Sequence, residues 1–203
     1  KRVDACLAAV RKAKVPMLVG FNRRFDPNFA ALHARLRAGE IGSVEQVIIS
    51  SRDPGLPPLA YLKVSGGQCR DMTIHDFDMA RFLLGEEPIE VFASASCLVD
   101  PGIGQAGDVD TAKTVLKTAS GKICVISNSR RSGYGYDQRV EAYGANGLLK
   151  ADNVLESTVA HWGADGPELD AFQNFFLDRY AEAYRTEVDH FAAVMAGEAT
   201  PLV

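Results

Sequence analysis

The chain begins with apolar side chains at helical spacing. Val3, Cys6, Leu7 and Val10 recur every three or four positions, which predicts an amphipathic helix. The run from Val15 to Gly20 is short and almost entirely apolar, as in a buried strand of a parallel sheet. Because no strand precedes this helix to complete a unit, we expect the first residues to be the end of a domain whose body is missing.

After this run the pattern alternates between helix, strand and loop. Proline in the first turn and glycine near the end predict a helix from Pro27 to Ala38. A run rich in valine and isoleucine predicts a strand from Ser43 to Ser51. Residues 53–66 are rich in proline and glycine, which favours a loop beside a site. A further helix is expected from about Asp71 to Leu84.

From Ile89 onward the apolar residues alternate with period two, as in strands. The predicted strands are Ile89–Leu98, Asp110–Thr118, Lys122–Arg131, Asp137–Tyr143, Gly147–Ala151 and Val154–Trp162. Short turn sequences separate several of them, so we expect successive strands to pair antiparallel. A long helix from about Leu169 to Ala196 closes the segment. The pattern predicts an α+β fold, in which helices cover one face of an open, mainly antiparallel sheet.

The second face of such a sheet has to be accounted for. Valine, isoleucine and leucine occur on both sides of the predicted strands, and monomers rarely expose that much apolar area. We therefore expect a homo-oligomer, a dimer or tetramer, that forms through the uncovered sheet face.

Composition and charge narrow the class of protein. With 203 residues, 47% of them hydrophobic, the chain can build one globular domain with a sizeable core, or a domain plus a fragment of another. The net charge of -4 without a basic stripe argues against a nucleic-acid partner and favours a small polar molecule. No apolar run approaches the ~18 residues that span a bilayer, and the first residues do not resemble a signal peptide. The default expectation is a cytoplasmic protein.

The cysteines and most histidines predict no chemistry of their own. Cys6, Cys69, Cys97 and Cys124 lack the spacing of metal ligands and lie in or beside apolar runs, so we expect free, mostly buried thiols. Cys69 precedes Asp71 by two residues, which leaves a reactive thiol there open. We expect structural roles for the histidines outside the Asp71 helix and no metal site; these are His33, His161 and His190.

The strongest chemical signal is an acid and an imidazole in one predicted helix. Asp71 and His75 are four residues apart, which in a regular helix places them on one face about 6 Å apart along the axis. Histidine titrates near neutral pH, and a neighbouring carboxylate can fix its tautomer, so the pair could remove a proton from an alcohol. Taken alone, the same spacing is also typical of a surface pair that only stabilises its helix.

These residues and their neighbours resemble a known family. The matching segments, in order, are Val19–Pro27, Gly42 with the strand that leads to Ser51-Arg52-Asp53-Pro54, Gly66-Gly67, Asp71–Asp78, and Gly133–Asp137. Their order and spacing are similar to those of the glucose-fructose oxidoreductase/inositol dehydrogenase (Gfo/Idh/MocA) family over essentially the whole chain. Among its branches, the inositol 2-dehydrogenases look most similar.

The resemblance implies a division into two domains. Family members have an N-terminal Rossmann domain that binds the dinucleotide and a C-terminal α+β domain that binds the substrate. Residues 1–21 would then be the last helix and strand of the first domain, and residues 22–203 the substrate-binding and oligomerising domain. The chain has no GxGxxG turn and no Glu-Lys-Pro segment, whose lysine assists catalysis in the family, and Lys1 does not replace that lysine. This fragment alone is therefore expected to be inactive.

The implied reaction is oxidation of a ring CH–OH to a ketone with NAD as cofactor, NADP being left open. His75 would take the hydroxyl proton, and Asp71 would orient His75 or hold an adjacent hydroxyl. Arg23, Asp53 and Tyr136 would bind substrate hydroxyls, with Tyr134 a weaker candidate. The inositol pattern often has asparagine where this chain has Asp53, so the identity of the polyol stays open.

Other interpretations of the same residues remain. Asp76 and Asp78 suit helix-face or supporting roles better than catalytic ones, and Arg24 suits a structural role. The chain could belong to a noncatalytic binding or regulatory module of the same fold, to a dehydrogenase of another sugar, or to an acid-base isomerase or lyase without a nicotinamide. A glycine-rich strand-turn-helix and a Glu-Lys-Pro segment upstream would favour the dehydrogenase over the noncatalytic module and over the isomerase or lyase.

Overall fold

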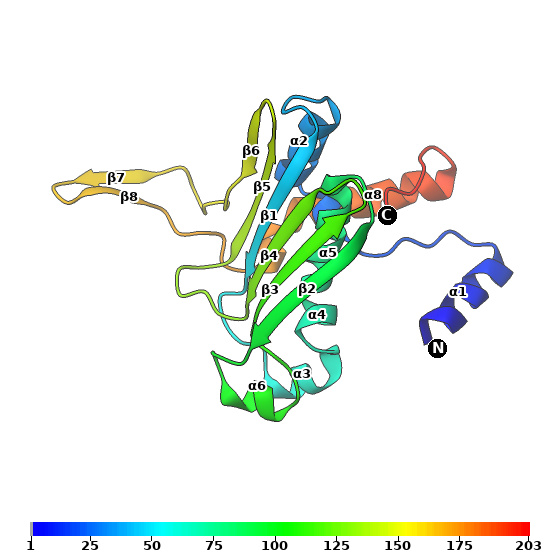
Figure 1. The fold of residues 1–203 in the computed structure, drawn as a ribbon, viewed down its shortest axis with the longest axis horizontal. Helices are drawn as coiled ribbons and strands as arrows, with labels where there is room; N and C mark the ends of the chain where they lie inside the picture. Colours follow the sequence, from blue (N-terminus) through cyan, green and yellow to red (C-terminus); the bar gives the residue numbers. More distant parts are fainter. Residues whose placement is uncertain (1) are drawn as a thin grey trace.

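The computed structural model describes residues 2–203 and shows one large sheet backed by helices, with a hairpin and a helix that extend from it (Figure 1). The strands are β1 (Val44–Arg52), β2 (Pro88–Ser96), β3 (Thr111–Thr118), β4 (Ile123–Ser129), β5 (Asp137–Gly144), β6 (Gly147–Ala151), β7 (Ala160–Gly163) and β8 (Gly166–Leu169). The helices are α1 (Arg2–Ala13), the 3-10 helix η1 (Asn22–Phe25), α2 (Pro27–Arg37), α3 (Leu59–Ser65), α4 (Gln68–Asp71), α5 (Thr73–Leu84), α6 (Pro101–Gln105), α7 (Phe176–Arg179) and α8 (Ala181–Ala196).

The large sheet has the strand order β2-β3-β4-β1-β5-β6. Its neighbours pair antiparallel except β1 and β4, which run parallel from Gln46 opposite Ile123 to Arg52 opposite Ser129. The expectation that β4 pairs with β5 is therefore wrong, because β1 lies between them. The connection from Ser129 to Asp137 is longer than a tight hairpin turn, so it can carry the chain past β1.

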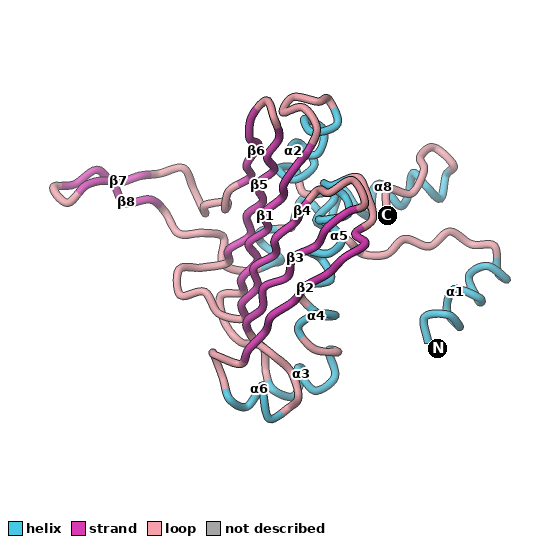
Figure 2. Tube along the Cα trace, in the orientation of Figure 1, coloured by secondary structure: helices cyan, strands magenta, loops and turns pink. Residues whose placement is uncertain are grey.

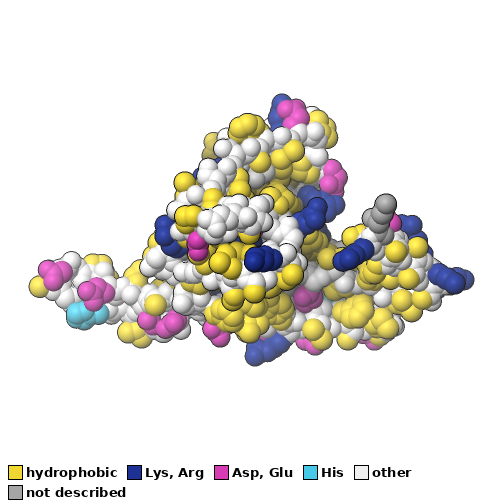
Figure 3. All heavy atoms as spheres, turned by 90° about the horizontal axis from the view of Figure 1, so that it is seen from below, with side chains coloured by type: hydrophobic (Ala, Val, Ile, Leu, Met, Phe, Trp, Pro, Cys, Tyr) yellow, Lys and Arg dark blue, Asp and Glu magenta, His cyan; other side chains and the backbone are white. Residues whose placement is uncertain are grey.

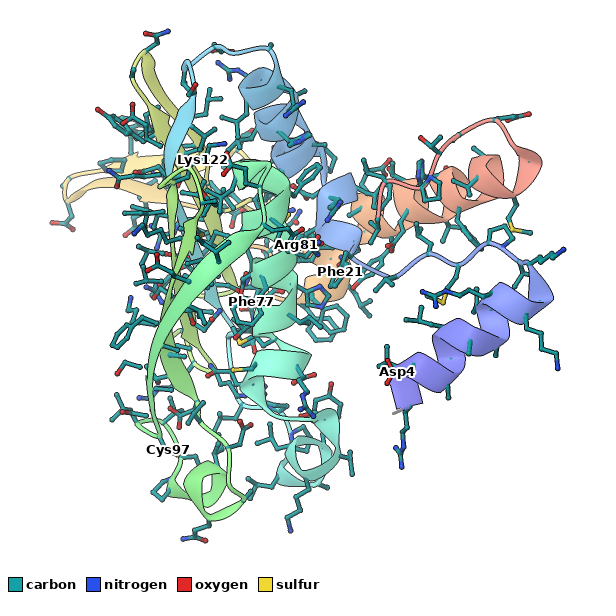
Figure 4. The ribbon with its side chains drawn as sticks, turned by 45° about the vertical axis from the view of Figure 1, so that its right-hand side comes forward. Asp4, Phe21, Phe77, Arg81, Cys97 and Lys122 are labelled. Atoms are coloured by element: carbon teal, nitrogen blue, oxygen red, sulfur yellow. The ribbon has the colours of Figure 1, made fainter. Side chains whose placement is uncertain are left out.

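One face of the sheet packs against α2, α5 and α8, and Figure 4 shows these helices together on that side. Alternate residues of the central strands point inward, among them Val47 and Ile49 of β1 and Ile126 of β4. They meet Phe29 of α2 and Met79 of α5 in one continuous core. The α+β fold predicted from the sequence is confirmed.

The predicted strand at Val15–Gly20 is absent, and these residues form an irregular connection between α1 and η1. Val15, Met17 and Val19 are exposed, and α1 has no buried residue. Figures 1 and 2 show α1 apart from the sheet and its helices. A strand forms only where another strand pairs with its backbone groups, and none of residues 2–203 does so here. Lys1 lies outside the described residues.

The segment from Val154 to about residue 180 also differs from the prediction. Residues near Val154 form only a single bridge, between Leu155 and Phe172, and β7 and β8 form a hairpin that projects from the body (Figures 1 and 3). The long closing helix is confirmed only as α8, preceded by the short α7. Gly166, the first residue of β8, has a φ of 105° directly after the hairpin turn, a conformation that glycine adopts without strain.

Two smaller expectations are also corrected. The region expected to be loop contains α3 in its second half. All four cysteines are free, but only Cys124 is buried, while Cys6 and Cys69 are exposed and Cys97 is intermediate. Cys6 is exposed because α1 packs on no part of the sheet.

Candidate functional site

A cavity of about 520 Å³ opens at the edge of the helical layer, where η1, α3, α4, α5 and the segment around α7 meet. Polar, aromatic, proline and two further apolar side chains line it; they are Asn22, Arg23, Asp53, Pro54, Leu56, Pro57, Pro58, Tyr61, Asp71, Met72, His75, Arg130, Tyr136, Phe175, Phe176, Tyr180 and Tyr184, together with Gly55. The cavity thus brings together His75, Asp71, Arg23, Asp53 and Tyr136 of the predicted site. Tyr134 does not line it.

Two glycines with positive φ form the turn between α3 and α4, which leads the chain to Asp71. Gly66 ends α3 with φ of 95°, and Gly67 precedes α4 with φ of 84°. A Cβ on Gly67 would lie 2.8 Å from Oδ1 of Asp108. The Asp108 carboxylate approaches this closely because it accepts a hydrogen bond from the backbone N–H of Gln68, at 2.9 Å.

The helix expected to carry Asp71 and His75 is interrupted between them. Asp71 is the last residue of α4, His75 lies in the first turn of α5, and Met72 separates the two helices with φ of -109° and ψ of -61°. The prediction of one regular helix is therefore wrong at this point. The i, i+4 geometry of a regular helix therefore does not apply to Asp71 and His75, which lie on either side of the break.

Asp71 is hydrogen-bonded to groups other than His75. Its Oδ2 accepts from both terminal nitrogens of Arg130, at 3.2 Å each, and its Oδ1 accepts from the hydroxyl of Tyr61. The Nδ1 of His75 is buried and has no hydrogen-bond partner among residues 2–203. The direct orientation of His75 by Asp71, one of two roles that the resemblance implied, is thus not seen in this geometry.

His75 is placed to accept a proton. The pKa of His75 is lowered to about 4, mainly by burial and also by the positive charge of Arg23, against the opposing effect of the Asp71 carboxylate. The ring of Phe21 meets the imidazole edge-on, with centroids 6.0 Å apart; Figure 4 labels Phe21 where the connection from α1 reaches the helical layer. At neutral pH the imidazole is therefore uncharged and has a lone pair to offer.

Asp53 is a second titratable group in the cavity. Burial raises the pKa of Asp53 to about 6, against the positive charges of Arg130 and Arg23. Its backbone N–H donates to the carbonyl of Ser129, at 3.0 Å, which fixes the start of the proline-rich loop to the end of the sheet. Above about pH 6 the carboxylate can accept hydrogen bonds from a bound hydroxyl compound.

Arg23 and its neighbour are held by buried carboxylates. Nη1 of Arg23 forms an ion pair with Asp76, which also accepts from Nδ2 of Asn128 at 2.7 Å. Arg24 makes two hydrogen bonds to Asp78, of 2.8 and 2.6 Å. The supporting roles expected for Asp76 and Asp78 agree with these contacts, although Arg23 still lines the cavity.

The two tyrosines of the Gly-Tyr-Gly-Tyr segment lie in different places. Tyr136 is buried in the cavity wall, its ring meets that of Tyr180 at 86°, and burial raises its pKa well above the ordinary value. It is therefore a neutral hydrogen-bonding group. Tyr134 is exposed, and its hydroxyl donates to Asp137 at 2.6 Å. The Tyr134 hydroxyl thus fixes a carboxylate outside the cavity.

Two negative findings concern the described residues only. No helix among them is long and apolar enough to cross a membrane. No three or more histidine, cysteine, aspartate or glutamate side chains in residues 2–203 come together in a way that could hold a metal ion.

Comparison with known proteins shows the family to which the chain belongs. A family model described as the GFO/IDH/MocA C-terminal domain matches residues 29–150. The chain belongs to the GFO/IDH/MocA family. The family resemblance inferred from the sequence motifs is thereby confirmed.

Individual members of the GFO/IDH/MocA family are similar over almost the whole chain. An inositol 2-dehydrogenase of Rhizobium meliloti (strain 1021) is 52% identical over 195 residues, which make up 96% of this chain and 59% of that protein. A scyllo-inositol 2-dehydrogenase (NAD(+)) of Bacillus subtilis (strain 168) is 39% identical over 194 residues, or 96% of this chain and 56% of that protein. The chain thus spans less than two thirds of the length of these relatives.

A solved structure of the family has the same fold. The crystal structure of a myo-inositol dehydrogenase from Corynebacterium glutamicum ATCC 13032 superimposes with a TM-score of 0.86 and 44% sequence identity. The superposition covers 90% of this chain and 55% of that one.

In this GFO/IDH/MocA domain, the polar cavity residues that were not among the predicted site residues include Arg130, Tyr61 and Asn22. A signal for Arg130 exists, since it continues the inward alternation of Cys124, Ile126 and Asn128 beyond the end of β4. A buried arginine at an inward position usually has a carboxylate partner. Tyr61 and Asn22 carry no comparable signal.

Proposed function

We propose that this chain is the substrate-binding part of an NAD-dependent dehydrogenase that oxidises a ring hydroxyl of an inositol to a ketone. The observation that carries the proposal is the cavity in which the neutral imidazole of His75 lies with the carboxylates of Asp71 and Asp53. The 52% identity to an inositol 2-dehydrogenase supports the substrate class.

The two domains are proposed on the same basis. Residues 1–21 are assigned to a Rossmann domain and residues 22–203 to the substrate domain. The exposed apolar side chains of Val15, Met17 and Val19 support this boundary, because a neighbouring parallel sheet would bury them.

In the proposed reaction, His75 accepts the hydroxyl proton as the ring carbon loses its hydride. A buried, uncharged imidazole is ready to take a proton, and Asp71 stabilises the positive charge that develops on it. Asp71 and Asp53 accept hydrogen bonds from further ring hydroxyls, and the neutral phenol of Tyr136 contributes another polar contact. Several hydroxyls in a partly dry cavity each need such a partner.

The residues of the cavity also fit a nicotinamide. The buried Nδ2 of Asn22 lines the cavity and has no hydrogen-bond partner among residues 2–203, so it can donate to an oxygen of a bound ring. When bound, NAD supplies the acceptor for the hydride. The NAD(+) in the name of the Bacillus subtilis relative supports this cofactor over NADP.

The uncovered face of the large sheet supports a homo-oligomer. Ile48 of β1, Tyr143 of β5 and Leu148 of β6 are each 43–47% exposed on the face opposite the helices. Neighbouring apolar side chains of this size are rarely left to water. We therefore propose that two copies of the full-length protein associate through this face.

An enzyme assay tests the function directly. The full-length protein is supplied with myo-inositol, scyllo-inositol or glucose, each with NAD and with NADP, and the absorbance of reduced nicotinamide is followed. Turnover of an inositol with NAD is expected. Turnover of glucose alone would make the protein a dehydrogenase of another sugar, and binding of a polyol without turnover would make it a noncatalytic module.

The scyllo isomer is a specific second candidate. The relative from Bacillus subtilis carries the name scyllo-inositol 2-dehydrogenase, and this chain is 39% identical to it. A higher kcat/KM with scyllo-inositol than with myo-inositol would favour that substrate.

A further inference from the structure

The carboxylate of Asp71 is fixed by side chains from two other parts of the fold. Arg130 follows β4 and holds Oδ2 through two hydrogen bonds of 3.2 Å. Tyr61 of α3 donates to Oδ1. The position of Asp71 in the cavity is thus decided by Arg130 and Tyr61 and not by His75.

Arg130 is itself firmly held. Its side chain is 1% exposed, and its Nη2 lies 3.7 Å from Oδ2 of Asp108, the carboxylate that caps the start of α4. Its backbone N–H donates to the carbonyl of Asp110, at 2.8 Å. Arg130 therefore connects both ends of α4, with Asp108 at the start and Asp71 at the end. A buried guanidinium is stable only with such partners.

We propose that Arg130 is a positioning residue for the inositol oxidation proposed above, on which this inference rests. Arg130 holds the Asp71 carboxylate at the cavity wall and balances its charge, so that Asp71 can accept a substrate hydroxyl and orient the ring toward His75. Both terminal nitrogens of the Arg130 guanidinium converge on Oδ2 while Tyr61 holds Oδ1, so each carboxylate oxygen has its own partner. A lysine ammonium is a single point charge on a flexible stem and does not supply these two converging contacts.

Arg130 also acts on the second carboxylate of the cavity. The groups that face Asp53 are the cations Arg130 and Arg23, which lower its pKa, and the anions Asp71 and Asp76, which raise it. Removal of the Arg130 charge leaves Arg23 as the one opposing cation of this set. The carboxyl of Asp53, whose pKa is already raised by burial to about 6, should then titrate at a still higher pH.

The test uses the full-length protein and three variants. Arg130→Gln removes the charge, Arg130→Lys keeps the charge but not the paired contact, and Arg131→Gln is the matched control at the exposed neighbouring arginine. We expect kcat to fall about 10–100-fold in both Arg130 variants, with a smaller change in KM, because a displaced catalytic group costs rate of this order. Arg131→Gln should keep the wild-type values.

The pH dependence of kcat/KM distinguishes a positioning role of Arg130 from a merely structural one. The acidic limb of kcat/KM should move to higher pH in Arg130→Gln and stay in place in Arg130→Lys. If Arg130→Gln does not fold, Arg130→Lys decides the matter by its kcat. A kcat within about twofold of wild type in a folded Arg130 variant would overturn the proposal.

A titration that does not depend on turnover tests the position of Arg130 separately from the proposed function. The Asp53 carboxyl is titrated by NMR in wild type and in Arg130→Gln, or in Arg130→Lys if only that variant folds. A midpoint raised in the Gln variant, or unchanged in the Lys variant, supports the position of Arg130 beside the site even if no inositol is oxidised. An unchanged Gln midpoint or a raised Lys midpoint would contradict that position, whatever the enzyme's substrate.

Discussion

At the scale of single residues, the cavity shifts the pKa values of two groups, His75 and Asp53, away from those of ordinary histidine and aspartate side chains. His75 is uncharged over the physiological range because burial and Arg23 lower its pKa to about 4. Asp53 changes charge at about pH 6 because burial raises its pKa. The two groups therefore leave distinct marks on the pH dependence of activity.

Replacement of His75 by alanine should abolish most of the turnover. The variant loses the proposed proton acceptor, and general base catalysis is worth about 10²–10⁴-fold in rate. Steady-state kinetics of the full-length enzyme measure the loss, and circular dichroism checks the fold. His161→Ala, on the exposed hairpin, is the matched control and should retain activity. Activity of His75→Ala within tenfold of wild type would exclude this role.

Asp53 should control the activity near pH 6. Above this pH the ionised carboxylate accepts hydrogen bonds from substrate hydroxyls, and below it the protonated form accepts fewer, so kcat/KM should rise as the pH passes upward through about 6. In Asp53→Asn this limb should vanish and leave only the limb of His75 near pH 4. A pH profile of each protein measures the effect. A limb near pH 6 that persists in Asp53→Asn would assign it to another group.

At the scale of elements, a buried ion pair ties the start of α2 to α7. Asp26 caps α2 by accepting from the N–H groups of Asn28 and Phe29, at 3.1 Å each. The same carboxylate pairs with Arg179 of α7, and both side chains are buried. This contact fixes the segment that supplies Phe176 and Tyr180 to the cavity wall.

Removal of Arg179 should destabilise the protein far more than removal of a surface arginine. Arg179→Met leaves the Asp26 carboxylate buried without its cation, which costs about 3–5 kcal/mol. Arg35→Met breaks an ion pair with Glu40 at the exposed surface, where water screens the two charges, so the loss of unfolding free energy should be small. Urea denaturation of the two variants measures the difference. If both variants lose the same unfolding free energy, the buried Asp26–Arg179 ion pair does not hold α7 against the start of α2.

The elements themselves were predicted to different degrees. The helix that became α2 and the strands β1 and β3–β6 were located from local pattern, because each has one face in the core. The hairpin β7–β8 and the break at Met72 were missed. The hairpin projects from the body and has no buried face, so it leaves no periodic trace in the sequence. Met72 is buried like its neighbours in α5, so its apolar side chain gives no sign that the helix is interrupted there.

At the scale of the whole molecule, the outer sheet face should decide the oligomeric state. Ile48→Arg places a charge at the centre of that face and should convert the proposed homo-oligomer to monomer, because a buried unpaired charge is costly. Sedimentation velocity at micromolar concentration measures this. Val64→Arg, at an exposed position of α3, is the control and should leave the assembly intact.

Two results would contradict this interface. If the wild-type protein sediments only as a monomer, the apolar outer face of the sheet does not form an interface between copies of this protein. An Ile48→Arg variant that keeps the wild-type sedimentation coefficient would place any interface elsewhere.

The sequence by itself determined the fold class and the family, and its short motifs grouped His75, Asp71 and Asp53, which line one cavity, because these features depend on local periodicity and on short motifs. The tertiary structure decided that β1 enters between β4 and β5 and that Asp71 is held by Arg130, 59 residues away. Such pairings form between segments far apart in the chain and depend on how the whole core packs. Local pattern reports which face of an element is buried, but not which partner it meets there.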